Sequence, residues 1–270
     1  MSTASRLITS FQNPTVKLVR SLELRKARRE TGLFVAEGLK VVATARDRGW
    51  APRLLLFGEG AGGGTIAELL DWASAAGAQC LQVSAPILEK IASRDNPQNL
   101  IGVFPQRWGK PPAEPATGDV WIALEEVRDP GNLGTIVRTC DAVGAGGVIL
   151  VGTCCDPFSR EAVRATMGSI FSMALVRMER SEFLRRAGTW PGEIVGTHLA
   201  AAQDYRSEYG GPVLLAMGGE GPGLSDDLAR ACTRLVKIPM AGSADSLNLA
   251  VATALVLYEI RRPFLELQVR

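Results

Sequence analysis

Short apolar segments alternate with longer amphipathic ones through almost the whole of this 270-residue chain. In the second half, strand-like runs such as 146–152 and 212–218 are almost continuously apolar, and segments with helical periodicity separate them. Such strands are buried on both faces, which is typical of a parallel sheet covered by helices on both sides. We therefore expect an α/β fold with a doubly wound, mostly parallel sheet.

A Pro- and Gly-rich stretch interrupts this alternation and predicts a linker at 107–118. It separates a small α/β domain at 1–106 from a larger domain at 119–270. In the first domain we expect strands at 32–38, 53–57, 80–84 and 100–104, and helices at 13–30, 39–49, 65–77 and 85–93. In the second we expect strands at 120–127, 146–152, 173–178, 193–199, 212–218 and 235–240, and helices at 132–144, 160–168, 181–188, 226–232 and 246–262.

Composition excludes a disordered, a collagen-like and a disulfide-framework protein. Apolar residues make up 46% of the chain and charged residues 21%, which is ordinary for a globular protein. Because no uninterrupted apolar run reaches about 18 residues, we expect no membrane span. Residues 1–20 lack the apolar core of a signal peptide, and we expect a cytoplasmic protein.

The five cysteines and the single histidine do not predict a metal site. No C-x-x-C pair occurs, whereas a zinc site requires about four ligands with paired spacing. We expect reduced, mostly buried thiols. His198 is expected to be structural or exposed, since no G-x-S-x-G motif accompanies it.

Positive charge is concentrated at the N-terminal end. Residues 1–53 hold 11 Lys and Arg against 4 Asp and Glu, a net of +7, whereas the whole chain carries only +2. A basic end predicts either a solvated helix face or contacts with the phosphates of a nucleic acid. The candidate nucleic-acid-binding residues, which the family resemblance given below assigns to RNA, are Lys17, Arg20, Arg25, Lys26, Arg28 and Arg29.

One glycine cluster, Gly58 to Gly63, matches G-x-G-x-x-G between a predicted strand and a predicted helix. This pattern is compatible with a nicotinamide-dependent oxidoreductase. However, the acidic residue that a dinucleotide site requires about 20 positions later is absent, and a flexible turn explains the glycines equally well.

Three other loops combine glycine with polar residues, at 129–134, 217–223 and 239–248. Each follows a predicted strand and precedes a predicted helix, so parallel strands would bring all three to one edge of the sheet. Helix capping by Asn132, Ser225 and Ser246 is the alternative explanation, and it is compatible with a binding site. Arg138 follows Asn132 by six residues in a largely apolar helix, so it requires a phosphate or carboxylate partner.

These loops resemble the three motifs of the SpoU (TrmH-type) RNA 2′-O-methyltransferases, a branch of the SPOUT class. The first motif is N-x-G-x-x-x-R, the second G-x-E-G-x-G-L and the third I-P-M-x-G…S-L-N-x-x-x-A. They correspond here to Asn132–Arg138, Gly218–Leu224 and Ile238–Ala252. The resemblance spans 119–270, and residues 8–22 and 34–42 resemble the small RNA-binding domain that often precedes this catalytic domain.

The resemblance implies a C-terminal trefoil knot, an S-adenosylmethionine site within it and a homodimer. It places the cofactor contacts at Met217, Gly218, Gly219, Ile238, Met240 and Leu247. It implies methyl transfer to a ribose 2′-hydroxyl by the catalytic group Arg138, Asn132, Glu220, Ser246 and Asn248.

In this interpretation Arg138 activates the hydroxyl or clamps the adjacent phosphate, and Asn132 orients Arg138 or the ribose. Glu220 accepts hydrogen bonds from Arg138 or the substrate, and Ser246 and Asn248 position them. The two-domain layout favours large-subunit rRNA over tRNA as substrate. A non-catalytic RNA-binding protein and an antibiotic-resistance methyltransferase remain open alternatives.

Overall fold

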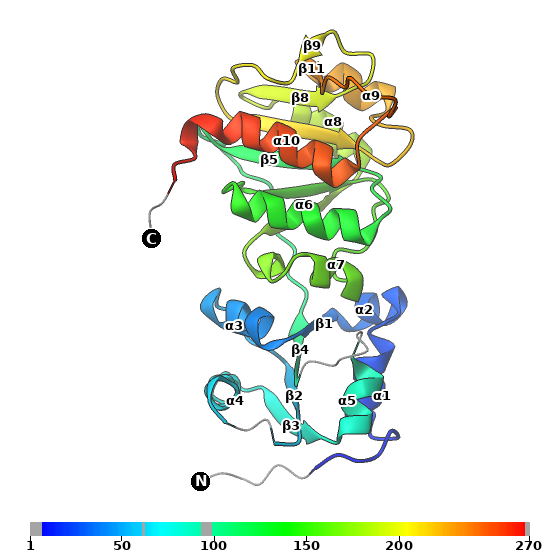
Figure 1. Ribbon diagram of the computed structural model, residues 1–270, viewed down its shortest axis with the longest axis vertical. Helices are drawn as coiled ribbons and strands as arrows, with labels where there is room; N and C mark the ends of the chain where they lie inside the picture. Colours follow the sequence, from blue (N-terminus) through cyan, green and yellow to red (C-terminus); the bar gives the residue numbers. More distant parts are fainter. Residues whose placement is uncertain (1–6, 61–62, 93–98, 268–270) are drawn as a thin grey trace. The chain divides into compact units, whose positions relative to one another are not determined.

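The computed structural model describes residues 7–60, 63–92 and 99–267, which form two compact units (Figure 1). The first unit contains the chain up to Gln106 together with Asp156–Ser172. The second contains Arg107–Cys155 and the chain from Met173 onward. The expected domain division assigned residues 156–172 to the second domain, whereas they pack within the first unit.

The first unit has a four-stranded mixed sheet in the order β1-β4-β2-β3. Strand β4 is antiparallel to β1 and β2, and β2 is parallel to β3. The strands are β1 (Leu33–Glu37), β2 (Leu54–Gly58), β3 (Gln79–Val83) and β4 (Leu100–Pro105). The helices are α1 (Pro14–Ser21), α2 (Arg25–Thr31), α3 (Leu39–Asp47), α4 (Thr65–Ala75), α5 (Ala85–Ile91) and α7 (Arg160–Ala165), followed by a 3-10 turn at Ser169–Phe171.

An aromatic cluster explains why residues 156–172 belong to the first unit. The rings of Phe34 and Phe158 lie 5.0 Å apart between centroids, and those of Phe104 and Phe171 lie 4.9 Å apart. The indole Nε1 of Trp50 donates to the carbonyl of Phe171 at 2.9 Å. The segment 156–172 therefore supplies part of the core of the first unit.

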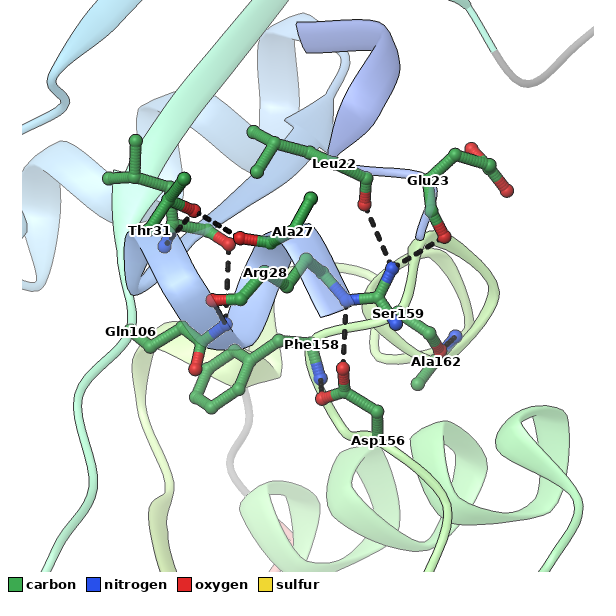
Figure 2. A network of polar contacts seen from close by, with 11 residues as sticks. Leu22, Glu23, Ala27, Arg28, Thr31, Gln106, Asp156, Phe158, Ser159 and Ala162 are labelled. Atoms are coloured by element: carbon green, nitrogen blue, oxygen red, sulfur yellow. Dashed lines mark hydrogen bonds and ion pairs between the residues drawn. The ribbon is translucent and has the colours of Figure 1, made fainter. Parts of the chain in front are cut away.

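The helix expected over 13–30 is two helices, because the backbone turns at Leu22–Leu24. Leu22 is fully buried, and Leu24 has extended geometry where α2 begins. This break frees the carbonyls of Leu22 and Glu23, which accept hydrogen bonds from Arg28 Nη1 at 2.8 and 2.7 Å (Figure 2). A buried arginine therefore compensates for the interrupted helix.

The second unit has a seven-stranded sheet in the order β7-β6-β5-β10-β8-β11-β9, and every recorded pairing is parallel. This agrees with the expected doubly wound fold. The strands are β5 (Val120–Glu125), β6 (Gly147–Val151), β7 (Ala174–Met178), β8 (Glu193–Thr197), β9 (Gln203–Asp204), β10 (Val213–Gly218) and β11 (Arg234–Lys237). The short β9 was not expected.

Helices cover both faces of this sheet. On one face, α6 (Pro130–Ala142) and α10 (Leu249–Arg261) lie side by side (Figure 1). On the other, α8 (Arg180–Ala187) and α9 (Asp226–Ala231) pack on strand residues such as Trp121 and Ile149. The chain leaves β11 near the edge of the sheet and returns through α10 to β10 in its middle. This return path fits the knot that the resemblance implies.

Residues 107–118, expected as a linker, lie against the second unit. Gly109 donates its N–H to the carbonyl of Leu175 at 2.8 Å, and the guanidinium of Arg177 lies 4.2 Å from the ring centre of Trp108. Arg186 donates to the carbonyl of Pro112. These contacts hold the segment along the sheet edge at β7.

None of the helices in the described ranges is long and apolar enough to span a membrane. The five cysteines are unbridged. Cys140 and Cys154 are buried, whereas Cys80, Cys155 and Cys232 are partly exposed, so the prediction that most of the thiols are buried is wrong. Burial raises the pKa of Cys155 and of Cys232 to about 12, so both thiols are uncharged at neutral pH.

Candidate active site

A cavity of about 710 Å³ lies at the carboxyl ends of β8, β10 and β11, against the start of α10. This is the edge at which ligands bind in open parallel sheets, and the volume is that of a small-molecule site. The cavity walls include all six residues expected to contact a cofactor, namely Met217, Gly218, Gly219, Ile238, Met240 and Leu247.

The glycine loop after β10 folds back on itself so tightly that side chains are excluded. A Cβ atom on Gly218 would lie 1.9 Å from the carbonyl carbon of Gly223, and one on Gly219 would lie 2.7 Å from the carbonyl oxygen of Glu126. Gly221 and Gly223 have positive φ values of 98° and 71°. The loop therefore presents bare backbone to the cavity, and a ligand can approach it closely.

A chain of hydrogen bonds connects three of the expected catalytic residues. Asn132 Nδ2 donates to Glu220 Oε1 at 2.9 Å, and Asn248 Nδ2 donates to Asn132 Oδ1 at 2.9 Å. The second oxygen of Glu220 accepts from the Arg128 N–H at 3.1 Å. The three loops thus converge at one edge of the cavity, as expected.

The carboxylate of Glu220 is held in its ionised form. Partial burial acts to raise its pKa, but the hydrogen bonds from Asn132 and from backbone N–H groups outweigh burial and lower it. Glu220 is therefore an anionic acceptor at neutral pH. Its charge favours a cationic ligand in the adjacent cavity and disfavours a phosphate.

Helix capping differs from the expectation at two of three positions. Asp129, not Asn132, caps α6, with Oδ1 accepting from the Asn132 N–H at 2.6 Å. Asn248, not Ser246, caps α10, with Oδ1 accepting from the Ala250 N–H at 2.9 Å. Ser225 caps α9 as expected. Asn132 and Ser246 are therefore not needed as caps, and Ser246 lines the cavity.

Arg138 does not join the hydrogen-bonded group. Its side chain is exposed on α6, and in the part of the chain that the structure describes it makes no hydrogen bond or ion pair and does not line the cavity. Six residues along a helix correspond to a rise of about 9 Å and a rotation of about 240°, so Asn132 and Arg138 face different directions. Of the two donors expected for Glu220, Arg138 or the substrate, Arg138 does not donate to it among the described residues, and Asn132 Nδ2 and the Arg128 N–H do.

Two features of the site were not predicted. The end of β8 and the segment after it line the cavity through Thr197, His198 and Leu199. His198 Nδ1 accepts from the Ala200 N–H at 3.1 Å. Its position after a parallel strand was the signal that could have identified it. Glu125, which is 2% exposed, accepts from the Ser225 N–H and Oγ at 2.8 and 2.7 Å and so anchors the far end of the glycine loop.

The expected RNA-binding residues are exposed on α1 and α2, with one exception. Arg28 is 4% exposed, and its Nε lies 2.8 Å from Asp156 Oδ2 (Figure 2). The prediction that Arg28 contacts RNA is therefore wrong, because a buried carboxylate and two backbone carbonyls already occupy its guanidinium. The exposed positions are Lys17, Arg20, Arg25, Lys26 and Arg29.

The other glycine cluster lies in the first unit, between β2 and α4. Its residues 61 and 62 lie outside the described residues, so the alternative of a dinucleotide site there, which the missing downstream acid disfavours, stays untested. Among the described residues, no three His, Cys, Asp or Glu side chains gather closely enough to hold a metal ion.

Residues 119–258 match the SpoU rRNA Methylase family, and residues 13–102 match the MRM3-like substrate binding domain. The solved structure of an AdoMet-bound rRNA methyltransferase from Sinorhizobium meliloti is 44% identical to this chain in sequence. The alignment covers 97% of this chain and 99% of that protein's chain, with a TM-score of 0.90. The 23S rRNA (uridine(2479)-2′-O)-methyltransferase of Streptomyces viridochromogenes is 32% identical over 96% of this chain and 93% of its own length. The 23S rRNA (guanosine(2553)-2′-O)-methyltransferase RlmP of Bacillus subtilis is 29% identical over 94% of this chain and 98% of its own. With its fold, its glycine loop and its three converging motifs, the chain belongs to the SpoU rRNA methylase family.

Proposed function

We propose that this protein transfers a methyl group from S-adenosylmethionine to a ribose 2′-hydroxyl of large-subunit rRNA. The observation that supports this best is that the expected cofactor-binding residues and the hydrogen-bonded catalytic residues lie at the same cavity. All six expected cofactor residues line it, and the Asn132–Glu220–Asn248 chain lies at its edge. The similarity to two named 23S rRNA 2′-O-methyltransferases supports the substrate class.

The cavity fits the cofactor in size and charge. Its volume is sufficient for a nucleoside-sized ligand, and the exposed backbone of Gly218 and Gly219 permits close approach. When bound, S-adenosylmethionine supplies an electrophilic methyl group on a positively charged sulfur. The ionised Glu220 carboxylate stabilises positive charge nearby. Met217, Ile238, Met240 and Leu247 would hold the cofactor around this backbone.

The protein contributes mainly positioning and electrostatics. Asn132 and Asn248 are fixed by each other, by Glu220 and by the start of α10, so their amides are pre-oriented for a ribose hydroxyl. Ser246 supplies a further hydroxyl at the cavity wall. Arg138 stays protonated and is therefore proposed as a clamp for the neighbouring phosphate, for which its exposed guanidinium is available.

We also propose that two copies of the chain form a homodimer through α10. Val251, Leu255 and Tyr258 follow one another at helical spacing and are 50%, 38% and 50% exposed. Exposed apolar side chains on one helix face indicate a protein interface. A ribosomal RNA substrate further supports a cytoplasmic location.

Incubation with methyl-labelled S-adenosylmethionine and either 23S rRNA or tRNA transcripts tests the function. We expect label in 23S rRNA at a linkage that resists alkaline hydrolysis, because a methylated 2′-oxygen cannot attack the phosphate. Label in tRNA alone would change the substrate, and alkali-sensitive labelled linkages would mean base methylation. No transfer despite cofactor and RNA binding would favour a non-catalytic RNA-binding protein.

A further inference from the structure

A second cavity, of about 300 Å³, lies within the first unit between the start of α3 and the region of α7. We refer to it as the α3 cavity. The side chains that matter here are those of Glu37, Leu39, Lys40, Arg160, Arg164 and Met167. None of these residues belongs to the expected RNA-binding set on α1 and α2.

The α3 cavity carries a net positive charge. Lys40 and Arg164 are exposed, and across the described residues neither side chain forms a hydrogen bond or an ion pair. The one carboxylate in the wall, Glu37, lies 3.0 Å from Arg160 Nη1, and both of these side chains are largely buried. Arg160 pairs with Glu37 and, through Nε at 2.9 Å, also with Glu23. One carboxylate charge is thus left against the two cations Lys40 and Arg164, so the balance stays positive and favours an anion.

Met167 places an exposed apolar side chain at the same cavity, 44% exposed. It follows the C-cap of α7, and its φ of +52° is the left-handed backbone that commonly ends a helix. The exposed side chain adds little to the core and leaves an apolar surface open to a ligand. Leu39, 37% exposed, provides a second apolar surface in the same wall.

We propose that the α3 cavity binds one nucleotide of unpaired RNA in the substrate. Its phosphate lies between Lys40 and Arg164, and its base and ribose pack on Met167 and Leu39. Two cations beside an apolar surface match the two parts of a nucleotide, and the cavity volume suits one nucleotide rather than a duplex. The proposal rests on the proposed function, because it takes RNA as the substrate.

Filter binding of a radiolabelled 23S rRNA transcript to the full chain, at several salt concentrations, tests this proposal. We expect the double variant Lys40→Ala with Arg164→Ala to lose affinity roughly tenfold and to lower the slope of affinity against salt by about one. Arg48→Ala is the matched control, since Arg48 is an exposed cation at the opposite end of α3. It is expected to change binding less than twofold.

Met167→Gly separates a ligand contact from a structural role. Glycine removes the apolar contact but accepts the left-handed backbone, so we expect weaker RNA binding, by roughly threefold, with an unchanged or higher melting temperature. Unchanged RNA affinity in both the double variant and Met167→Gly would overturn the proposal, and so would an equal loss of RNA affinity in Arg48→Ala. In either case, methylation of rRNA by the wild type would leave the proposed function intact. If the wild type bound the cofactor but neither bound nor methylated rRNA, the proposed function would fail first.

Discussion

Asn132 and Glu220, which are 88 positions apart in the sequence, meet through a hydrogen bond of 2.9 Å between Nδ2 and Oε1. This bond ties the start of α6 to the glycine loop after β10. Because Asn248 donates to the other end of the Asn132 amide, the orientation of that amide is fixed. A single side chain therefore connects all three motif loops.

Replacing Glu220 by Gln is expected to lower kcat/KM for methyl transfer about tenfold. Glutamine has one acceptor and one donor group, so it cannot accept from both Asn132 and Arg128. A hydrogen bond to a charged group contributes about 1.5 kcal/mol when solvent screens it, and a loss of that size corresponds to the tenfold lower kcat/KM. Steady-state kinetics on 23S rRNA provides the measurement. Asp227→Asn, at an exposed ion pair on α9, is the control and should retain wild-type activity.

The same carboxylate predicts a pH dependence. The pKa of Glu220 is lowered, so its contribution to stability is fully present above the ordinary value of 4.5 and is lost as pH falls through the lower value in the folded protein. We expect a ¹³C-NMR titration of the Glu220 carboxyl to have its midpoint below 4.5. A midpoint at or above 4.5 would contradict the hydrogen-bonding arrangement described for Glu220.

Two substitutions of Asn248 separate its role in capping from its role in the site. The carboxylate of the Asn248→Asp variant would still accept from the start of α10 but could not donate to Asn132, whereas the Asn248→Ala variant would do neither. We expect Asn248→Ala to reduce the free energy of unfolding by about 1 kcal/mol and Asn248→Asp to change it little. Both variants should lose activity. An Asn248→Asp variant with full activity would remove Asn248 from the proposed site.

Arg28→Ala is expected to reduce the free energy of unfolding of the first unit by about 3–5 kcal/mol, because it leaves the buried Asp156 carboxylate without its partner. Arg29→Ala, an exposed change one residue later, should alter it by less than about 0.5 kcal/mol. Urea unfolding followed by tryptophan fluorescence provides the measurement, and Trp50 is one of the reporters because it lies in the core of the same unit. Equal stability of the two variants would show that the buried ion pair contributes little.

Leu255→Glu is expected to convert a dimer into a monomer, because it places a charge in the exposed apolar face of α10. Sedimentation velocity of the wild type and the variant, measured at the same protein concentration, tests this prediction. Leu24→Glu, at a leucine that is 64% exposed in the first unit, is the control and should leave the dimer intact. A wild type that sediments as a monomer would remove the dimer proposal.

Local sequence patterns predicted most of the fold and the centre of the site. Apolar runs located the long strands, and the motif loops brought Asn132, Glu220 and Asn248 together because parallel strands end at one edge. The break in the first helix could not be read from its sequence, since the residues that favour it include Asp156, 128 positions away from Arg28. The different directions of Asn132 and Arg138, in contrast, follow from six residues of helix and could have been predicted from the sequence.

The return of residues 156–172 to the first unit has a consequence for how the protein is made. A ribosome completes all four strands of the small sheet before it synthesises Phe158 and Phe171, which fill the aromatic core beside them. Until then Phe34 and Phe104 lack these ring partners, and their apolar surface stays uncovered in the nascent chain. Completion of this aromatic core therefore waits for β5, α6 and β6 of the second unit to be synthesised. A gene fragment that encodes only residues 1–106 would give a product without either of these two rings.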